Sequence, residues 1–258
     1  MTNKKKKLIT TVTTTVIEEI INDPTNEKTH LICILDTSGS MISIMSDSIG
    51  GFNTFLKKQK ELPDKATITV ALFDDQYKLV YDNVDIKNAE ELTEKIWFPR
   101  GSTALYDAIG KTINNEKQNF IRLGNEKPAK VLVCIVTDGE ENASKEYRLE
   151  DIKKLIKICE NDNWNFIYLA ANQDAFEVGS GFGISMNNTF TYTASGQGVA
   201  NMSANLINAS TTYRGMHTNS ASFNRMSKSL ITKDTKDDNI VNDLINTSDN
   251  TINITSIK

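Results

Sequence analysis

The sequence predicts an α/β fold built on an open, mostly parallel sheet with one antiparallel edge strand and helices on both faces. Two continuous apolar runs, at residues 31–35 and 131–136, have the length and composition of strands buried on both faces. Around them, strand-like segments alternate with segments whose apolar residues recur at helical spacing. This alternation favours parallel strands joined by helices, which is a Rossmann-like arrangement.

The first half of the chain supplies a strand, a helix and a hairpin in that order. After the first apolar run, apolar residues at helical spacing predict a helix over residues 44–60, and Pro63 ends the pattern. Residues 67–73 and 77–81 have strand composition and are separated by a short polar segment. We expect them to form a hairpin, which makes the second of them the antiparallel edge strand.

The second half repeats the alternation of helices and strands. Ser102 and Thr103 open a predicted helix that ends near Gly124, and the second apolar strand follows it. The remaining predicted elements are, in order, a helix over residues 149–159, a strand over 164–171, a Gly-rich connection at 179–183, a short strand at 189–193 and a closing helix at 199–213.

A single domain accounts for most of the chain. With 258 residues and 39% hydrophobic content, the chain is long enough to form one large core. We assign residues 28–215 to this domain and residues 1–27 to an N-terminal extension. Residues 216–258 are rich in polar side chains, which predicts a flexible C-terminal extension.

Composition and charge argue against several classes of function. The 29 basic and 33 acidic residues are mixed along the chain and give a net charge of −4, which argues against a nucleic-acid-binding surface. No segment approaches the roughly 18 consecutive apolar residues of a membrane span, and the polar residues after the lysines at 4–7 argue against a secretory signal. We therefore expect a cytoplasmic protein in which Cys33, Cys134 and Cys159 are reduced core residues.

The first apolar strand ends in a segment suited to metal binding. Asp36 follows the strand directly, and Ser38 and Ser40 place hydroxyls at alternate positions after it. Ligands of open α/β sheets bind beyond the carboxyl ends of the strands, and Mg²⁺ prefers oxygen ligands while it keeps several waters. Gly39 allows the segment to curl so that these oxygens converge. Taken alone, the segment is more typical of a turn or a helix N-cap than of a metal site.

Two later segments carry matching chemistry. Residues 131–139 form an apolar run that ends in Asp138 and a glycine, and residues 98–109 form a turn that places the Thr103 hydroxyl before a helix. With these segments the chain resembles the von Willebrand factor A (vWA) domain, in a stand-alone prokaryotic or phage form. In that family a metal-ion-dependent adhesion site (MIDAS) is assembled from an Asp-x-Ser-x-Ser loop, a Thr in a second loop and an Asp that closes a hydrophobic strand.

The resemblance implies a metal site and a way of using it. It implies that a divalent ion is surrounded, directly or through water, by Asp36, Ser38, Ser40, Thr103 and Asp138. Mg²⁺ is the expected ion, with Mn²⁺ or Ca²⁺ as alternatives, because a mixed carboxylate and hydroxyl shell accepts several hard cations. An Asp or Glu of a protein partner then binds the ion, so the implied function is a metal-dependent protein-binding adaptor that is not an enzyme.

Two other classes of function remain open. The chain can be a structural or scaffolding subunit of a larger ATPase-linked, stress or defence assembly, in which the metal only stabilises the fold. It can also be a Mg²⁺-dependent phosphohydrolase with an aspartate nucleophile, but such enzymes need a second carboxylate where this chain has Ser38. His30 opens the first strand at the end opposite Asp36, and His217 follows the last helix, so neither supports catalysis.

Several residues beside the predicted loops have two interpretations. We expect Glu140 and Glu141 to start the next helix rather than to bind a second metal. Met41 is expected to pack onto the first helix rather than to contact a partner, and Arg100 is expected to balance local negative charge. The Gly-rich stretch at 179–183 is either a flexible lip of the binding face or a simple connection.

Overall fold

The computed structural model describes residues 27–171 and 175–216. The extensions predicted at residues 1–27 and 216–258 therefore fall almost wholly outside the described residues, as does His217. Among the described helices, none has the length and apolar composition that crossing a bilayer requires.

Strands and helices alternate along the described chain as predicted. The strands are β1 (Thr29–Asp36), β2 (Ala66–Phe73), β3 (Tyr77–Asp85), β4 (Lys130–Thr137), β5 (Trp164–Ala171) and β6 (Thr189–Tyr192). The helices are α2 (Met45–Glu61), α3 (Leu105–Leu123), α4 (Leu149–Asn161), α5 (Ala175–Phe182) and α6 (Gly196–Gly215).

The strands form one sheet in the order β3-β2-β1-β4-β5-β6. All neighbours pair in parallel except β2 and β3, which form the predicted antiparallel hairpin at one edge. Parallel pairing aligns the carboxyl ends of β1 and β4, because Leu35 pairs with Val136. Asp36 at the end of β1 therefore lies beside Thr137 at the end of β4, and Asp138 follows directly.

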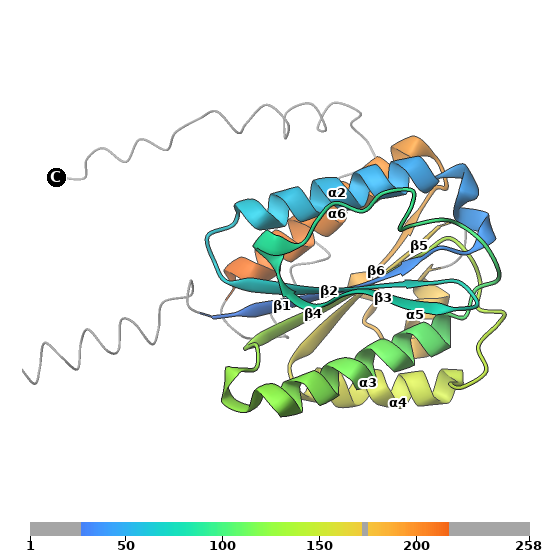
Figure 1. The fold of residues 1–258 in the computed structure, drawn as a ribbon. Coiled ribbons are helices and arrows are strands. Elements are labelled where there is room, and N and C mark those ends of the chain that lie inside the picture. The colour runs from blue at the N-terminus through green and yellow to red at the C-terminus, as the bar shows by residue number, and fades with distance from the viewer. Residues whose placement is uncertain (1–26, 172–174, 217–258) are drawn as a thin grey trace, which may run out of the picture.

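Helices cover both faces of the sheet, with α2 and α6 on one face and α3, α4 and α5 on the other (Figure 1). In β1, Leu31 and Leu35 pack with the first pair of helices, whereas Ile32 and Ile34 pack with the other three. Alternate residues of a strand point to opposite faces, so a strand covered on both faces is apolar throughout. The three cysteines are buried and free, as expected.

Two segments differ from the sequence-based expectation. The Gly-rich stretch lies mostly within α5, where a Cβ on Gly179 would lie only 2.1 Å from Thr189 Cγ2 of β6. Gly179 is therefore a close-packing position of a helix on the sheet and not part of a binding lip. The second difference concerns Glu140 and Glu141, because α4 begins only at Leu149 and both residues lie in the preceding loop.

Candidate metal centre

Asp36 is fully buried at the carboxyl end of β1. Its Oδ1 accepts a hydrogen bond from the Ser38 backbone N at 2.6 Å, and its Oδ2 accepts one from the Thr137 hydroxyl at 2.5 Å. Trp97 Nε1 donates to the Asp36 main-chain oxygen at 3.1 Å. The carboxylate is thus held in one orientation at the edge of the sheet where ligands of open α/β folds bind.

Two hydroxyls connect the first loop to the second carboxylate. The short 3-10 helix η2 (Gly39–Ser43) brings the loop back on itself after Asp36, so that Ser38 Oγ and Ser40 Oγ are 3.0 Å apart. Ser40 Oγ donates a hydrogen bond to Asp138 Oδ1 at 2.6 Å. The oxygen atoms of the Asp-x-Ser-x-Ser loop and of Asp138 are therefore neighbours.

The third loop joins the cluster through the surroundings of Gly139. A Cβ on Gly139 would lie 3.1 Å from Thr103 Oγ1, 3.3 Å from Ser40 Oγ and 3.8 Å from Ser38 Oγ. The three predicted hydroxyls therefore converge on one small space that only a residue without a side chain leaves open. The structure brings all five predicted site residues together.

The two carboxylates lie in a shielded, negatively charged place. Burial, with a smaller contribution from the negative charge of Asp138, raises the pKa of Asp36 to about 6, although hydrogen bonds from Ser38 and Thr137 oppose the change. Burial also raises the pKa of the half-buried Asp138, against the hydrogen bond from Ser40. Two carboxylates in such a place favour a nearby cation, because a positive charge stabilises the ionised form of both.

The donor set fits a hard divalent cation. It consists of two carboxylates and three hydroxyls, and all of its donor atoms are oxygen. Within residues 27–171 and 175–216, no cluster of three or more His, Cys, Asp or Glu side chains is placed to bind a metal. The hydroxyls are therefore a necessary part of this donor set. Few charged ligands and several neutral oxygens suit an ion that keeps waters in its shell, as Mg²⁺ does.

Comparison with known proteins identifies the fold. No model of a known protein family and no curated protein sequence matches the chain. Among solved structures, the vWF domain of the type V pili tip protein Mfa5 from Porphyromonas gingivalis matches with a TM-score of 0.51 and 10% identity, over 72% of this chain and 96% of that domain. The chain has a vWA fold.

Two further solved structures are similar at lower scores. Proximal thread matrix protein 1 from the mussel byssus, solved with a zinc-occupied MIDAS motif, matches with a TM-score of 0.49 and 15% identity over 72% of this chain. Manganese-loaded TRAP protein from Plasmodium vivax matches with a TM-score of 0.44 and 20% identity over 56% of this chain. The match spans 46% of the mussel chain and 57% of the TRAP chain, so each is only about half covered.

The loop before α3 of this vWA fold is bonded directly to the first loop. Arg100 N donates to Thr37 O at 2.8 Å, and Gly39 N donates to Gly101 O at 3.1 Å. Arg100 Nε also lies 2.7 Å from Asp74 Oδ2, so Arg100 balances a buried carboxylate, as predicted. These bonds keep the segment that carries the Thr103 hydroxyl beside the Asp-x-Ser-x-Ser loop.

Glu141 has a role that was not predicted from the sequence. Its Oε1 accepts hydrogen bonds from Ala143 N at 2.9 Å and Ser144 N at 2.7 Å. Its Oε2 accepts from Tyr106 N at 2.9 Å and Ser144 Oγ at 2.7 Å. Four donors fill the acceptor positions of the carboxylate, so Glu141 neither starts a helix nor has an oxygen left for a second metal. Glu140, in contrast, is exposed.

Two more side chains fasten this segment, the Asp138 loop (residues 138–148), to the start of α3. Asn142 Oδ1 accepts from Thr103 N at 2.9 Å, and Asn142 N donates to Thr103 O at 3.0 Å. The Asp107 carboxylate accepts hydrogen bonds at 2.9 Å from all three backbone N–H groups of residues 145–147. Burial raises the pKa of Asp107, but these bonds outweigh it and leave the pKa below its ordinary value.

The exposed surface beside the site is partly apolar. Met41 is buried, so it packs in the core as expected, whereas the next residue, Ile42, is 71% exposed. Phe98, in the loop that carries Thr103, is 64% exposed. No pattern in the sequence distinguished these two residues, because an apolar side chain in a loop can be buried or exposed.

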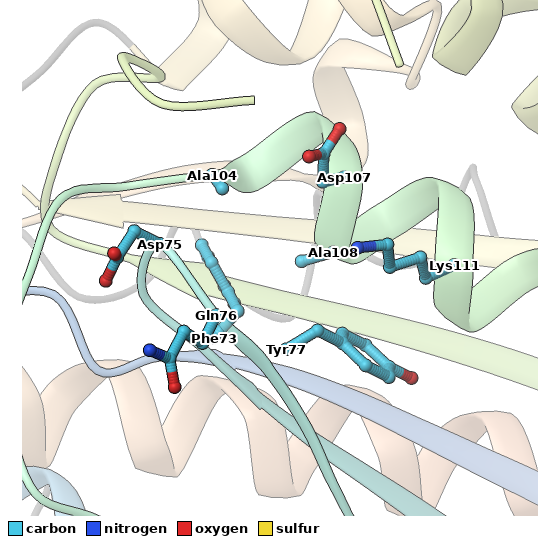
Figure 2. Close-up of a pocket in the computed structure, with 8 residues that line it drawn as sticks. All are labelled: Phe73, Asp75, Gln76, Tyr77, Ala104, Asp107, Ala108 and Lys111. Carbon is cyan, nitrogen blue, oxygen red and sulfur yellow. The ribbon is translucent and has the colours of Figure 1, made fainter. Parts of the chain in front are cut away.

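A small cavity of about 50 Å³ lies between the β2–β3 hairpin and the start of α3 (Figure 2). Phe73 and Tyr77 line it from the strands, and Asp107 and Lys111 line it from the helix. The Asp107 carboxylate is occupied by the Asp138 loop, and Lys111 Nζ lies 2.8 Å from Glu146 Oε1. Asp107 and Lys111 are therefore already engaged with the Asp138 loop, and we assign this cavity no ligand.

Proposed function

We propose that this chain is a metal-dependent protein-binding adaptor that works through one divalent ion. The ion is Mg²⁺ in first place, with Mn²⁺ or Ca²⁺ as alternatives, held directly or through water by Asp36, Ser38, Ser40, Thr103 and Asp138. The observation that carries this proposal is the convergence of three hydroxyls on the space beside Gly139, next to one buried and one half-buried carboxylate. Residues 28–215 form the binding module in this proposal.

The proposed ion supplies the attraction for an acidic partner. Two carboxylates balance its charge, and the exposed side of the cluster, at Ser40, leaves room for a further ligand. An Asp or Glu carboxylate of the partner takes that position. Without the ion, Asp36 and Asp138 would repel such a carboxylate, so binding depends on metal.

The surface around the ion favours a partner with apolar residues beside its carboxylate. Ile42 and Phe98 are large, exposed and carried by the two loops that also carry Ser40 and Thr103. These loops are bonded to each other through Gly39 N and Gly101 O. Burial of each such side chain in an interface contributes on the order of 1.5–3 kcal/mol.

The second candidate is a scaffolding subunit whose metal only stabilises the fold. The complete burial of Asp36 and its two hydrogen bonds favour this possibility, because a fully enclosed carboxylate also serves to join β1 to β4. We propose no enzymatic activity, since Ser38 stands where an aspartate-based phosphohydrolase needs its second carboxylate. We propose a cytoplasmic location, supported by three buried, free cysteines.

An affinity capture with controlled metal content tests the proposal. The wild-type chain is immobilised in Mg²⁺ and in EDTA, and Asp36→Asn is immobilised in Mg²⁺; partners eluted from native extract are identified by mass spectrometry. The adaptor function predicts a partner that binds only to the wild type with metal. Identical partners in all three conditions would instead support the scaffold, and so would a metal-dependent melting temperature without metal-dependent binding.

A further inference from the structure

Two of the proposed ligands depend on a contact between loops for their relative position. Thr103 precedes α3, and Asp138 follows β4, so no strand pairing holds the two residues together. The first loop links them indirectly, through the bonds from Gly39 to Gly101 and from Ser40 to Asp138. The Asp138 loop links them directly, because its Asn142 bonds both the N–H and the carbonyl group of Thr103. The position of Thr103 relative to Asp138 therefore depends on how this loop is fastened.

Glu141 is the residue that fastens the Asp138 loop in two directions. One carboxylate oxygen binds the loop's own backbone at Ala143 and Ser144, and the other reaches Tyr106 N in the first turn of α3. The N-cap residue of α3, Ala104, has no side chain that can cap the helix. Glu141 therefore supplies the missing acceptor and places a negative charge at the positive end of the helix.

We propose that Glu141 is a positioning residue of the metal centre and sets the affinity for the ion without binding it. With the loop fastened, Thr103 and Asp138 are already in place for one ion. With the loop released, the ion would have to order the loop as it binds. This inference rests on the proposed metal-binding function.

The proposal has a reciprocal consequence. If the fastened loop favours metal binding, then bound metal favours the fastened loop by the same factor, because coupling between two equilibria acts equally in both directions. Addition of metal should therefore slow hydrogen exchange at the amides that Glu141 accepts from, namely those of Tyr106, Ala143 and Ser144.

Metal titration of matched variants tests the proposal. Mn²⁺ and Mg²⁺ binding to the full chain is measured by calorimetry for wild type, Glu141→Gln and Glu141→Ala. Groups that orient metal ligands typically change the affinity by about 10- to 100-fold when they are replaced, so we expect the Kd to rise by about that factor. Glu141→Gln keeps one acceptor oxygen and should lose less affinity than Glu141→Ala.

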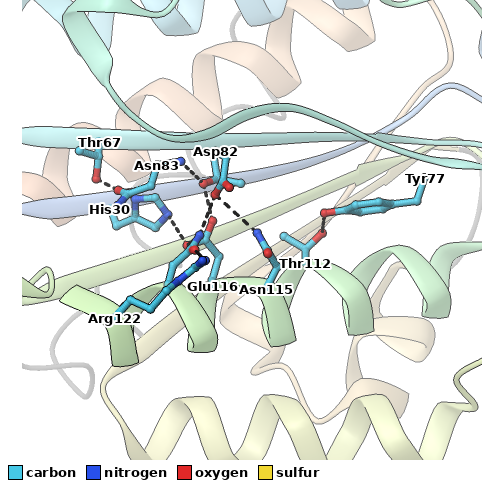
Figure 3. Close-up of polar contacts among 11 residues, drawn as sticks. His30, Thr67, Tyr77, Asp82, Asn83, Thr112, Asn115, Glu116 and Arg122 are labelled. Carbon is cyan, nitrogen blue, oxygen red and sulfur yellow. Dashed lines mark hydrogen bonds and ion pairs between the residues drawn. The ribbon is translucent and has the colours of Figure 1, made fainter. Parts of the chain in front are cut away.

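Two control variants separate positioning from charge and from stability. Glu140→Gln removes the same charge one residue away on an exposed side chain, and should change the Kd little because solvent screens that charge. Glu116→Gln removes a buried carboxylate farther along α3, bonded to Thr69 and 3.4 Å from His30 Nε2 (Figure 3). It should lower the melting temperature and leave the Kd unchanged.

The outcomes distinguish this inference from the function on which it rests. A wild type that binds metal, together with a Glu141→Ala variant of equal affinity, would overturn the inference and leave the proposed function standing. The inference would also be overturned if Glu116→Gln or Glu140→Gln weakened binding as much as Glu141→Gln does. A wild type that binds neither ion would overturn the proposed function, and the inference with it.

Discussion

At the scale of single residues, Gly139 keeps the proposed metal site open. Its φ angle is not in the left-handed region, so backbone conformation does not require a glycine there. The requirement comes from space, because a Cβ would approach the hydroxyl oxygens of Thr103 and Ser40 more closely than side chains normally do. Gly139 thus keeps the site open because it has no side chain.

Gly139→Ala should weaken Mg²⁺ binding more than it weakens the fold. The added methyl group occupies the space on which three hydroxyls converge, and we expect a loss of affinity of at least about tenfold, which corresponds to about 1.4 kcal/mol. Calorimetric titration measures the affinity, and urea denaturation measures the stability. Gly181→Ala is the matched control, since nothing lies within 4 Å of its added Cβ. Equal affinity in Gly139→Ala and wild type would show that this space is not where the ion binds.

The same scale explains which site residues could be predicted from the sequence. Asp36, Ser38 and Ser40 form a local pattern, and Asp138 ends an apolar strand, so their chemistry can be recognised without a structure. Glu141 could not be recognised in this way, because one of its main partners, Tyr106, is 35 residues away in the chain. Its identity as an acidic residue after a strand indicated a helix start, and the contact between loops determined otherwise.

At the scale of elements, helix α5 was not predicted, because the close packing of this helix requires a residue that disfavours helices. Its sequence contains two glycines, which are unfavourable inside helices and suggested a connection. The structure requires one of them, because α5 packs so closely on β6 that a Cβ on Gly179 would lie 2.1 Å from Thr189 Cγ2 and 3.5 Å from a ring carbon of Tyr168. Helix propensity was outweighed by tertiary packing.

Gly179→Ala should therefore destabilise the fold, although alanine is the better helix former. Overpacking of a core typically costs about 1–3 kcal/mol, which exceeds the gain in helix propensity of about 1 kcal/mol. Urea denaturation of Gly179→Ala and Gly181→Ala measures the difference, since both substitutions lie in α5 and only the first meets a neighbour. A Gly179→Ala variant as stable as Gly181→Ala would contradict the close packing.

A buried contact between His30 Nε2 and Glu116 Oε2, 3.4 Å apart, joins α3 to the sheet at the end opposite the metal centre (Figure 3). Burial raises the pKa of Glu116, but interaction with His30 and hydrogen bonds from Thr69 and Asn119 outweigh this and leave the pKa below its ordinary value. A carboxyl group with a lowered pKa in the folded state adds stability above its unfolded pKa of about 4.3–4.5, and this stability is lost as the pH falls through the lowered value.

In Glu116→Gln, the free energy of unfolding should consequently depend less on pH at acid pH than it does in the wild type. Wild type should be more stable than the variant at pH 7, and the difference should shrink as the pH falls below about 4.5. Urea denaturation of both proteins between pH 7 and the acid limit measures it. A difference that stays constant over this range would mean that ionisation of Glu116 does not contribute.

At the scale of the whole molecule, helices cover the two faces of the sheet, and the carboxyl ends of its strands are left for binding. The parallel sheet, its antiparallel edge and the helices on both faces were predicted, because apolar runs and helical spacing are properties of the sequence itself. The strand order was not, since it depends on which helices pack on which face. The exposure of Ile42 and Phe98 near the carboxyl ends of the strands could not be predicted either, because it depends on how the loops fold.

Replacement of Ile42 and Phe98 should weaken partner binding without weakening metal binding. Ile42→Ser and Phe98→Ser remove exposed apolar surface, so we expect stability within about 0.5 kcal/mol of wild type and an unchanged Kd for Mg²⁺. The amount of metal-dependent partner captured should fall. Ile121→Ser, which changes a 70% exposed residue near the end of α3, should leave capture unchanged. Unchanged capture by all three variants would mean that Ile42 and Phe98 do not contribute to partner binding and that the ion alone makes the contact.

Anomalous diffraction from a Mn²⁺-soaked crystal shows whether the five oxygen-bearing residues hold one divalent ion. We predict one anomalous peak at bonding or water-bridged distance from Asp36, Ser38, Ser40, Thr103 and Asp138, which is absent in crystals of Asp36→Asn. A well-ordered site without a peak at millimolar Mn²⁺, or a peak elsewhere on the chain, would contradict the claim.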